Sequence, residues 1–287
     1  MSSAIHGIDH VVIAVRDLDA SAATYARLGF TLTPRALHST GSQNHCIMLG
    51  RDYLELLGLP PKAVGPWQTY FAQFLSGGEG LGGFALASFD ADAARHHLQV
   101  QGFAPEAVQD LSRAVDDPAA KLKGIARFRL VTTPSKLTPG AQVFVAEHKT
   151  RPLVWAPAYK AHANTAFEIA ALSMVTDNVA STASTYARVF GTVRSPMPKR
   201  IDEGLLVETG MAPISFSTRA ALQARLRGVG LAERSGTFAA ALWIRVQDRA
   251  ATQAHLERYG VKFTRLSDGS LAVDAAQANG VAIIFGA

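Results

Sequence analysis

His10 is the first residue whose type and position could do chemistry, because it lies in an otherwise apolar segment, IDHVVIAV, at residues 8–15. Alternate side chains of a strand share a face. The β-branched set of Val11, Ile13 and Val15 therefore suits packing under a following helix, and His10 would face the other side. A histidine in this position is either a metal ligand or a structural residue that hydrogen-bonds to its neighbours.

Two other apolar segments also contain isolated polar groups. Glu55 stands between two leucines in YLELLGL, and a buried carboxylate is costly unless it is paired or bound to a metal. In FVAEHK, Glu147 and His148 are neighbours, so they point to opposite faces and only one of them can enter the same space.

The segment that carries His10 occurs twice. Residues 7–30 and residues 167–191 each show an apolar strand, an Asp or Asn, an Ala-rich helix that contains Thr-Tyr-Ala-Arg, and an exit with a glycine. At the offset that aligns the two Thr-Tyr-Ala-Arg sequences, His10 aligns with Ala171. The segment is therefore duplicated, but only the first copy keeps the histidine. We expect the functional site to lie in the first copy.

A second repeat completes the organisation. Residues 90–102 and 248–260 carry aspartate, histidine, leucine and glycine at matching positions. The chain is therefore a duplicated pair of units, each with one strand, one helix and three strands. We predict an α+β fold of four tandem βαβββ modules, with curved mixed sheets and helices outside. The predicted N-terminal half spans residues 1–150, a linker spans 151–164, and the C-terminal half spans 165–287.

Composition limits the class of protein. Of the 287 residues, 48% are hydrophobic and 18% are charged, as in a globular protein. No apolar run approaches the roughly 20 residues that span a bilayer, and the first ten residues lack the pattern of a signal peptide. With a single cysteine, we predict a cytoplasmic protein. The net charge is +5, but the Lys and Arg residues are scattered along the sequence, so we expect neither nucleic acid nor a membrane as a partner. We expect the protein to be a monomer or a homodimer.

Other common catalytic motifs are absent from the sequence. Cys46 and His45 are neighbours in a strand-like segment and point to opposite faces, so they do not form a nucleophile pair. No serine nucleophile elbow occurs. The glycine-rich segment LSGGEGLGG, residues 75–83, follows no strand and opens no helix. We predict a flexible link there rather than a phosphate-binding loop.

Taken together, these segments resemble the vicinal-oxygen-chelate superfamily of glyoxalase I, extradiol dioxygenases and bleomycin-resistance proteins, and more narrowly its glyoxalase-like domain proteins. In that superfamily, paired βαβββ modules form a cup, and metal ligands lie on the first and fourth strands of each module. The resemblance is carried by IDHVVIAVRDLDASAATYARLGF, HSTGSQNHCIML, YLELLGL, FVAEHKTRPLVW and HANTAFEIAAL.

The resemblance implies a metal site formed by His10, Glu55 and His148. Two imidazoles and one carboxylate leave coordination positions open for water or substrate, and they suit one divalent ion of Fe, Mn, Zn or Ni. Gly83 stands near the place of a further histidine in glyoxalase I, which argues against a site with four ligands. Glu147 is the alternative to His148, and Glu55 could instead form an internal salt bridge with an arginine.

Three more residues are candidates for contact with a substrate or with the metal ligands. His45 lies in the predicted third strand, near Glu55 if the fold is right, or else it is a partly exposed edge residue. His38, in the loop HSTGSQN, could line the mouth of the cup. Tyr53 shares a strand face with Glu55.

The function implied by the resemblance is a metal-dependent lyase or isomerase, or an extradiol-type dioxygenase, that acts on a small oxygenated substrate. Glu55 would be the catalytic base. The alternative is a metal-free protein that sequesters a small hydrophobic compound, as bleomycin-resistance proteins do. A third possibility is a degenerate module that serves assembly. The C-terminal half lacks the histidine, so we expect it to be structural or to close over the substrate.

Overall fold

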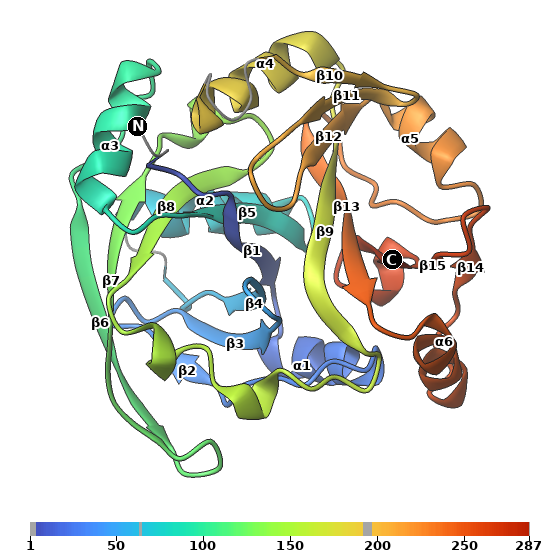
Figure 1. Ribbon diagram of the computed structural model, residues 1–287, viewed down its shortest axis with the longest axis horizontal. Helices are drawn as coiled ribbons and strands as arrows, with labels where there is room; N and C mark the ends of the chain where they lie inside the picture. Colours follow the sequence, from blue (N-terminus) through green and yellow to red (C-terminus); the bar gives the residue numbers. More distant parts are fainter. Residues whose placement is uncertain (1–3, 63–64, 192–196, 287) are drawn as a thin grey trace.

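The computed structural model describes residues 4–62, 65–191 and 197–286. Its elements repeat the order of one strand, one helix and three strands four times (Figure 1). The N-terminal half contains β1 (Ile8–Val15), α1 (Leu18–Arg27), β2 (Ala36–Leu37), β3 (Gln43–Met48), β4 (Tyr53–Gly58), β5 (Gly80–Ala87), α3 (Ala91–Val100), β6 (Gln109–Asp117), β7 (Leu122–Thr132) and β8 (Gln142–His148).

The C-terminal half repeats this order. One helix follows the first module of each half, α2 (Gly65–Ser76) after β4 and α5 (Arg219–Arg225) after β12. The other elements are β9 (Ala166–Val175), α4 (Val179–Phe190), β10 (Lys199–Ile201), β11 (Gly204–Val207), β12 (Ile214–Ser217), β13 (Phe238–Val246), α6 (Arg249–Arg258), β14 (Thr264–Arg265), β15 (Leu271–Val273) and β16 (Ala282–Gly286).

The strand order within the first half explains how a cup forms. β1 pairs with β4 in parallel and with β5 antiparallel, and β8 extends the sheet from the other side of β5. β3 lies beyond β4, while β7 and β6 lie beyond β8. The sheet is curved (Figure 1), as expected from the twist of adjacent strands. The predicted α+β fold of tandem βαβββ modules is confirmed.

Local sequence signals account for the helix starts. Asp17, Asp90 and Asp248 each precede a helix, and their side chains accept hydrogen bonds from backbone N–H groups of the first turn. These caps fix the direction in which the chain leaves β1, β5 and β13. The repeated aspartates of the sequence are thus helix caps in three of the four modules.

The predicted flexible link at residues 75–83 is wrong in its second part, because β5 begins at Gly80. A Cβ atom at Gly82 would lie 3.0 Å from the ring of Phe71, and one at Gly83 would lie 2.7 Å from a backbone oxygen. Glycine is therefore needed where α2 packs on β5, rather than for flexibility.

The segment between the halves is held in place by buried polar contacts. His162 accepts a hydrogen bond from the Thr31 backbone through Nδ1 and donates to the Met48 carbonyl through Nε2. Asn164 donates to the Leu28 carbonyl. These hydrogen bonds attach the segment to the first module. Neither side chain lines the cup. The predicted boundaries at residues 150 and 165 stay a prediction.

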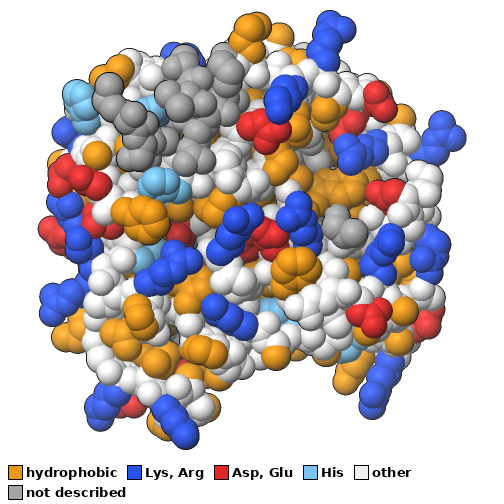
Figure 2. All heavy atoms as spheres, viewed as in Figure 1, with side chains coloured by type: hydrophobic (Ala, Val, Ile, Leu, Met, Phe, Trp, Pro, Cys, Tyr) orange, Lys and Arg blue, Asp and Glu red, His pale blue; other side chains and the backbone are white. Residues whose placement is uncertain are grey.

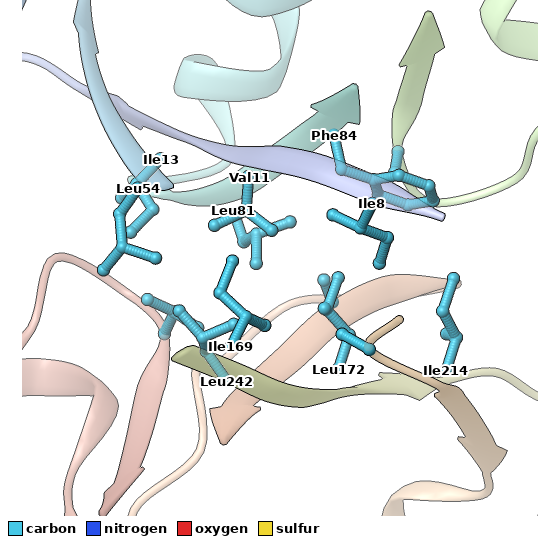
Figure 3. Packing of buried hydrophobic residues seen from close by; sticks show 14 of the residues in the cluster. Ile8, Val11, Ile13, Leu54, Leu81, Phe84, Ile169, Leu172, Ile214 and Leu242 are labelled. Atoms are coloured by element: carbon cyan, nitrogen blue, oxygen red, sulfur yellow. The ribbon is translucent and has the colours of Figure 1, made fainter. Parts of the chain in front are cut away.

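The halves pack through the apolar faces of their strands, and one backbone pair, Ala239 on β13 with Leu81 on β5, joins these strands into a continuous sheet. Figure 3 shows Val11 and Ile13 pointing toward Ile169 and Leu242 of the other half, and all four belong to one buried cluster. We expected Val11 and Ile13 to pack under a helix. The second half takes this place because its own strands present a matching apolar face.

We expect Ile169→Val, which removes one methylene from this interface, to lower the free energy of unfolding by about 1 kcal/mol. Ile169 is 2% exposed, whereas Ile125 is 50% exposed. Ile125→Val is therefore the matched control, with no measurable effect in urea unfolding. Equal effects of the two substitutions would contradict the packing described here.

The surface shows no single charged region on the face in Figure 2. Lys and Arg side chains lie scattered there among carboxylates and hydrophobic side chains. In the part of the chain that the structure describes, no helix has the length and apolar character needed to cross a membrane.

Candidate functional site

The concave side of the first-half sheet encloses a cavity of about 290 Å³. Five residues singled out in the sequence line it, and they come from β1, the loop before β3, β4 and β8: His10, His38, Tyr53, Glu55 and His148. The fold therefore brings together side chains that are far apart in the sequence. Apolar side chains supply most of the remaining wall, among them Trp67, Leu111, Phe128, Leu130, Phe144 and Val154.

Asp9 joins two of the histidines that line this cavity, His10 and His148. His10 Nδ1 donates to Asp9 Oδ2 at 2.8 Å, and His148 Nε2 donates to the same oxygen at 3.0 Å. Asp9 is 2% exposed. Burial alone would raise the pKa of Asp9, but the hydrogen bonds from His10 and His148 outweigh it and hold the pKa well below its ordinary value. Asp9 is thus a buried carboxylate that fixes the orientation of two imidazoles.

The sequence analysis missed Asp9 because regular alternation along β1 would place its side chain on the face of the strand that does not carry His10. The structure breaks this alternation with a bulge. Ile8 pairs with Leu86 and His10 with Ala85, so Asp9 has no partner of its own on β5. A bulge redirects the extra side chain, and Asp9 reaches His10 and His148 on the cup side. The signal available in the sequence was an aspartate inside an apolar strand.

Asp9, His10 and His148 form a compact group. Each offers one candidate ligand atom, and these atoms lie within 4.8 Å of one another; no other such group of three or more occurs among the described residues. One carboxylate and two imidazoles suit a divalent transition metal. His148 Nδ1 is buried and has no hydrogen-bond partner among the described residues. The donor set and this unpaired nitrogen fit a bound ion.

Glu55 lies next to this group without belonging to it. Its Oε2 is 3.6 Å from His10 Nε2, and its Oε1 accepts a hydrogen bond from Asn44 at 2.5 Å. Among the described residues, the ionisable side chains within 4 Å of its carboxylate are His10 and His38 rather than an arginine. Burial would raise the pKa of Glu55, but His38, His10 and Asn44 together lower it to about 2. The role of Glu55 as a metal ligand stays a prediction.

Two of the candidate residues lie outside the cavity. His45 donates through Nδ1 to the Thr33 carbonyl at 2.8 Å, because Asn44 and Cys46 are the residues of β3 that face the cup. Glu147 accepts a hydrogen bond from the Ala91 backbone at 3.0 Å. Of the neighbours on β8, His148 is thus the one that enters the cup, as alternation requires.

Aromatic rings pack against the two histidines, His10 and His148. Tyr53 stacks on His10 with ring centroids 4.3 Å apart, and Trp155 meets His148 edge-on at 4.8 Å. Burial raises the pKa of Tyr53 well above its ordinary value, so its hydroxyl stays protonated. Trp155 Nε1 is buried without a hydrogen-bond partner among the described residues. These contacts leave the imidazoles little freedom to rotate.

The equivalent place in the C-terminal half has different chemistry. Ala171 stands where His10 stands in the first half, and it pairs with Trp243 on β13. Trp243 Nε1 donates to Ser173 Oγ at 2.9 Å, and the Arg225 guanidinium lies 4.5 Å from the Trp243 ring. Trp243 therefore occupies the space over Ala171, and in the described residues no compact group of metal-ligating side chains occurs in this half.

Comparison with known proteins identifies a family. A family model described as a glyoxalase-like domain matches residues 8–190, from β1 to the end of α4. No curated protein matches the chain.

Among solved structures, the chain is similar to a hypothetical protein from Staphylococcus aureus, with a TM-score of 0.67, 12% identity, and coverage of 97% of this chain and 98% of that one. A mutant of 4-hydroxymandelate synthase from Streptomyces coelicolor gives a TM-score of 0.63 at 11% identity, with 98% and 92% covered. A xylose isomerase-like TIM barrel/4-hydroxyphenylpyruvate dioxygenase fusion protein gives 0.56 at 14%, with 99% and 49% covered. At these identities the likeness is one of fold.

Proposed function

Because this chain belongs to the glyoxalase-like domain family of the vicinal-oxygen-chelate superfamily, we propose that its N-terminal cup is a metal-dependent active site for a small oxygenated substrate. The reaction would be that of a lyase, an isomerase or a dioxygenase. The observation that carries the proposal is the buried Asp9, whose carboxylate holds His10 and His148 in the lining of a cavity.

His10 and His148 would hold the ion through the ring nitrogens that Asp9 does not contact, His10 Nε2 and His148 Nδ1, and Asp9 would support both rings. The ion would be Fe(II), Mn(II), Zn(II) or Ni(II). When bound, it would act as a Lewis acid on a substrate oxygen. The protein's own contribution is orientation. Asp9 fixes which nitrogen of each ring carries the proton, and the ring contacts of Tyr53 and Trp155 fix the ring planes.

Glu55 acts next to this centre as a fixed negative charge. With a pKa lowered to about 2, it is ionised at neutral pH and is a weak proton acceptor in this state. It is therefore suited to accept a hydrogen bond from a substrate hydroxyl rather than to remove a proton from carbon. The His38 side chain is 32% exposed, so it connects Glu55 to solvent at the cavity mouth.

Elemental analysis of the purified protein tests the proposal. We expect about one divalent ion per wild-type chain, and none when His10→Ala and His148→Ala are combined. His45→Ala is the matched control, since this histidine lies outside the cavity, and it should keep the ion. A wild type that holds no ion and cannot be loaded with any of the four metals would contradict the proposal.

The alternative is a metal-free protein that binds and sequesters a small compound. One observation favours it: Asp9 already satisfies one nitrogen of each histidine without an ion. In that case the double variant would lose stability and ligand binding together, and the wild type would bind its ligand equally well after treatment with a chelator.

A further inference from the structure

One cationic side chain lines the cavity, and the proposed function does not use it. Arg113 is the single arginine or lysine among the lining residues that the structure describes. The same cavity is lined by histidine and carboxylate groups and by the rings of Trp67, Phe128 and Phe144. A guanidinium in these surroundings requires an explanation.

Arg113 belongs to the inner face of the ribbon formed by β6 and β7. Leu111 pairs with Phe128 and Arg113 pairs with Ala126. Alternation places Leu111, Arg113 and Val115 on the same face of β6. Val115, Ala126 and Phe128 pack with residues of β3 and β4 in one apolar cluster. Arg113 is therefore half-buried where the far edge of the sheet approaches β3 and closes the cup.

Arg113 has no anionic partner within the described part of the chain, where no ion pair or side-chain hydrogen bond includes it. Two carboxylates line the cavity with it, Glu55 and Glu106. Glu55 is held by Asn44 and His38, and Glu106 is exposed and accepts from Gln109 at 3.3 Å. The positive charge of Arg113 is thus left uncompensated beside an apolar wall.

We propose that Arg113 binds the carboxylate of the ligand, so that the substrate of this cup is a small carboxylic acid with an apolar body. The inference rests on the proposed function, because it names the substrate class of the same cavity. A guanidinium presents parallel N–H donors that match the two oxygens of a carboxylate. Pairing with it would compensate a charge that is half removed from water.

The remaining walls fix how such an acid lies. The negative charges of Asp9 and Glu55 together balance a divalent ion at the histidines, so Arg113 is the lining group left to attract an anion. The acid therefore lies with its carboxylate at β6 and its neutral end toward His10. The volume of about 290 Å³ is close to the lower limit of roughly 300 Å³ for small-molecule pockets, so we expect a small body such as a single ring with a short chain.

Three probes of nearly equal shape test the proposal: phenylacetate, phenylacetamide and phenyl phosphate. Their binding to the purified full-length protein is measured by isothermal titration calorimetry, and metal content is determined on the same preparations. We expect the wild type to bind phenylacetate at least about tenfold more tightly than phenylacetamide. In Arg113→Gln the acid should bind no better than the amide.

Two further variants keep the result interpretable. Arg113→Lys retains the charge without the paired donors, so it should retain part of the preference for the acid. Arg127→Gln is the matched control, because Arg127 is exposed on the neighbouring strand and does not line the cavity. It should bind both probes as the wild type does.

Equal binding of acid and amide to the wild type, or a preference that survives in Arg113→Gln, would overturn the proposal. Tighter binding of phenyl phosphate would overturn the carboxylate as the group recognised. A wild type that prefers the acid but cannot be loaded with metal would support this inference and overturn the proposed metal-dependent function. The two failures are thus distinguishable.

Discussion

Asp9→Ala is expected to weaken metal binding by at least about tenfold and to lower the free energy of unfolding by about 2–4 kcal/mol. Both effects have one origin, because the substitution removes the acceptor of His10 Nδ1 and of His148 Nε2 in a buried place. The two rings lose their orientation, and their N–H groups lose their partner. Chelator competition measures the first effect, and urea unfolding of the metal-free protein measures the second.

Asp9→Asn separates the two effects. An asparagine has the same shape and still accepts one hydrogen bond, so it should recover most of the stability while the metal affinity stays low. Glu147→Gln is the matched control: Glu147 is another buried carboxylate, 4% exposed, but it lies on the outer side of β8. Its substitution should leave metal binding unchanged. Unchanged metal affinity in Asp9→Asn would exclude Asp9 from the site.

The second large effect concerns the contact between the halves and depends on pH. Asp52 is 1% exposed and accepts from the Ile169 backbone N–H at 3.1 Å. Burial and the neighbouring Glu168 raise the pKa of Asp52 to about 7, although the hydrogen bond and Arg51 oppose this. The folded chain therefore binds this proton more tightly than the unfolded chain, whose carboxyl titrates near ~3.9. Its contribution is fully present below about pH 4 and is lost as the pH rises through about 7.

We accordingly expect Asp52→Asn to be more stable than the wild type at pH 8 by about 4 kcal/mol and nearly equal to it at pH 4. The asparagine oxygen still accepts the Ile169 hydrogen bond but carries no charge. Urea unfolding at a series of pH values measures the difference. Asp116→Asn is the control, because this carboxylate is exposed on β6. A stability difference that does not change with pH would refute the account of Asp52.

Local patterns in the sequence predicted much of the fold. The duplicated strand-helix segments, the capping aspartates and the placement of His10 on the cup side all depend on neighbours within a few residues. The module pattern predicted three strands after each helix, but the position of β6 was not predicted. Its residues alternate between the cavity side and solvent and include four charged side chains, so its apolar signal is weak. Arg113, which lies on this strand, therefore had no place in the predicted site.

The sequence by itself determined which half carries the polar groups, since Ala171 replaces His10 in the second copy. The tertiary structure decided which of those groups meet. Asp9 and His148 are 139 residues apart, and their contact requires both the bulge opposite β5 and the pairing of β5 with β8. The bulge depends on how β1 pairs with its partner strand, so the alternation of residues along β1 alone does not predict it. The direction of the Asp9 side chain is therefore known only once the sheet is assembled.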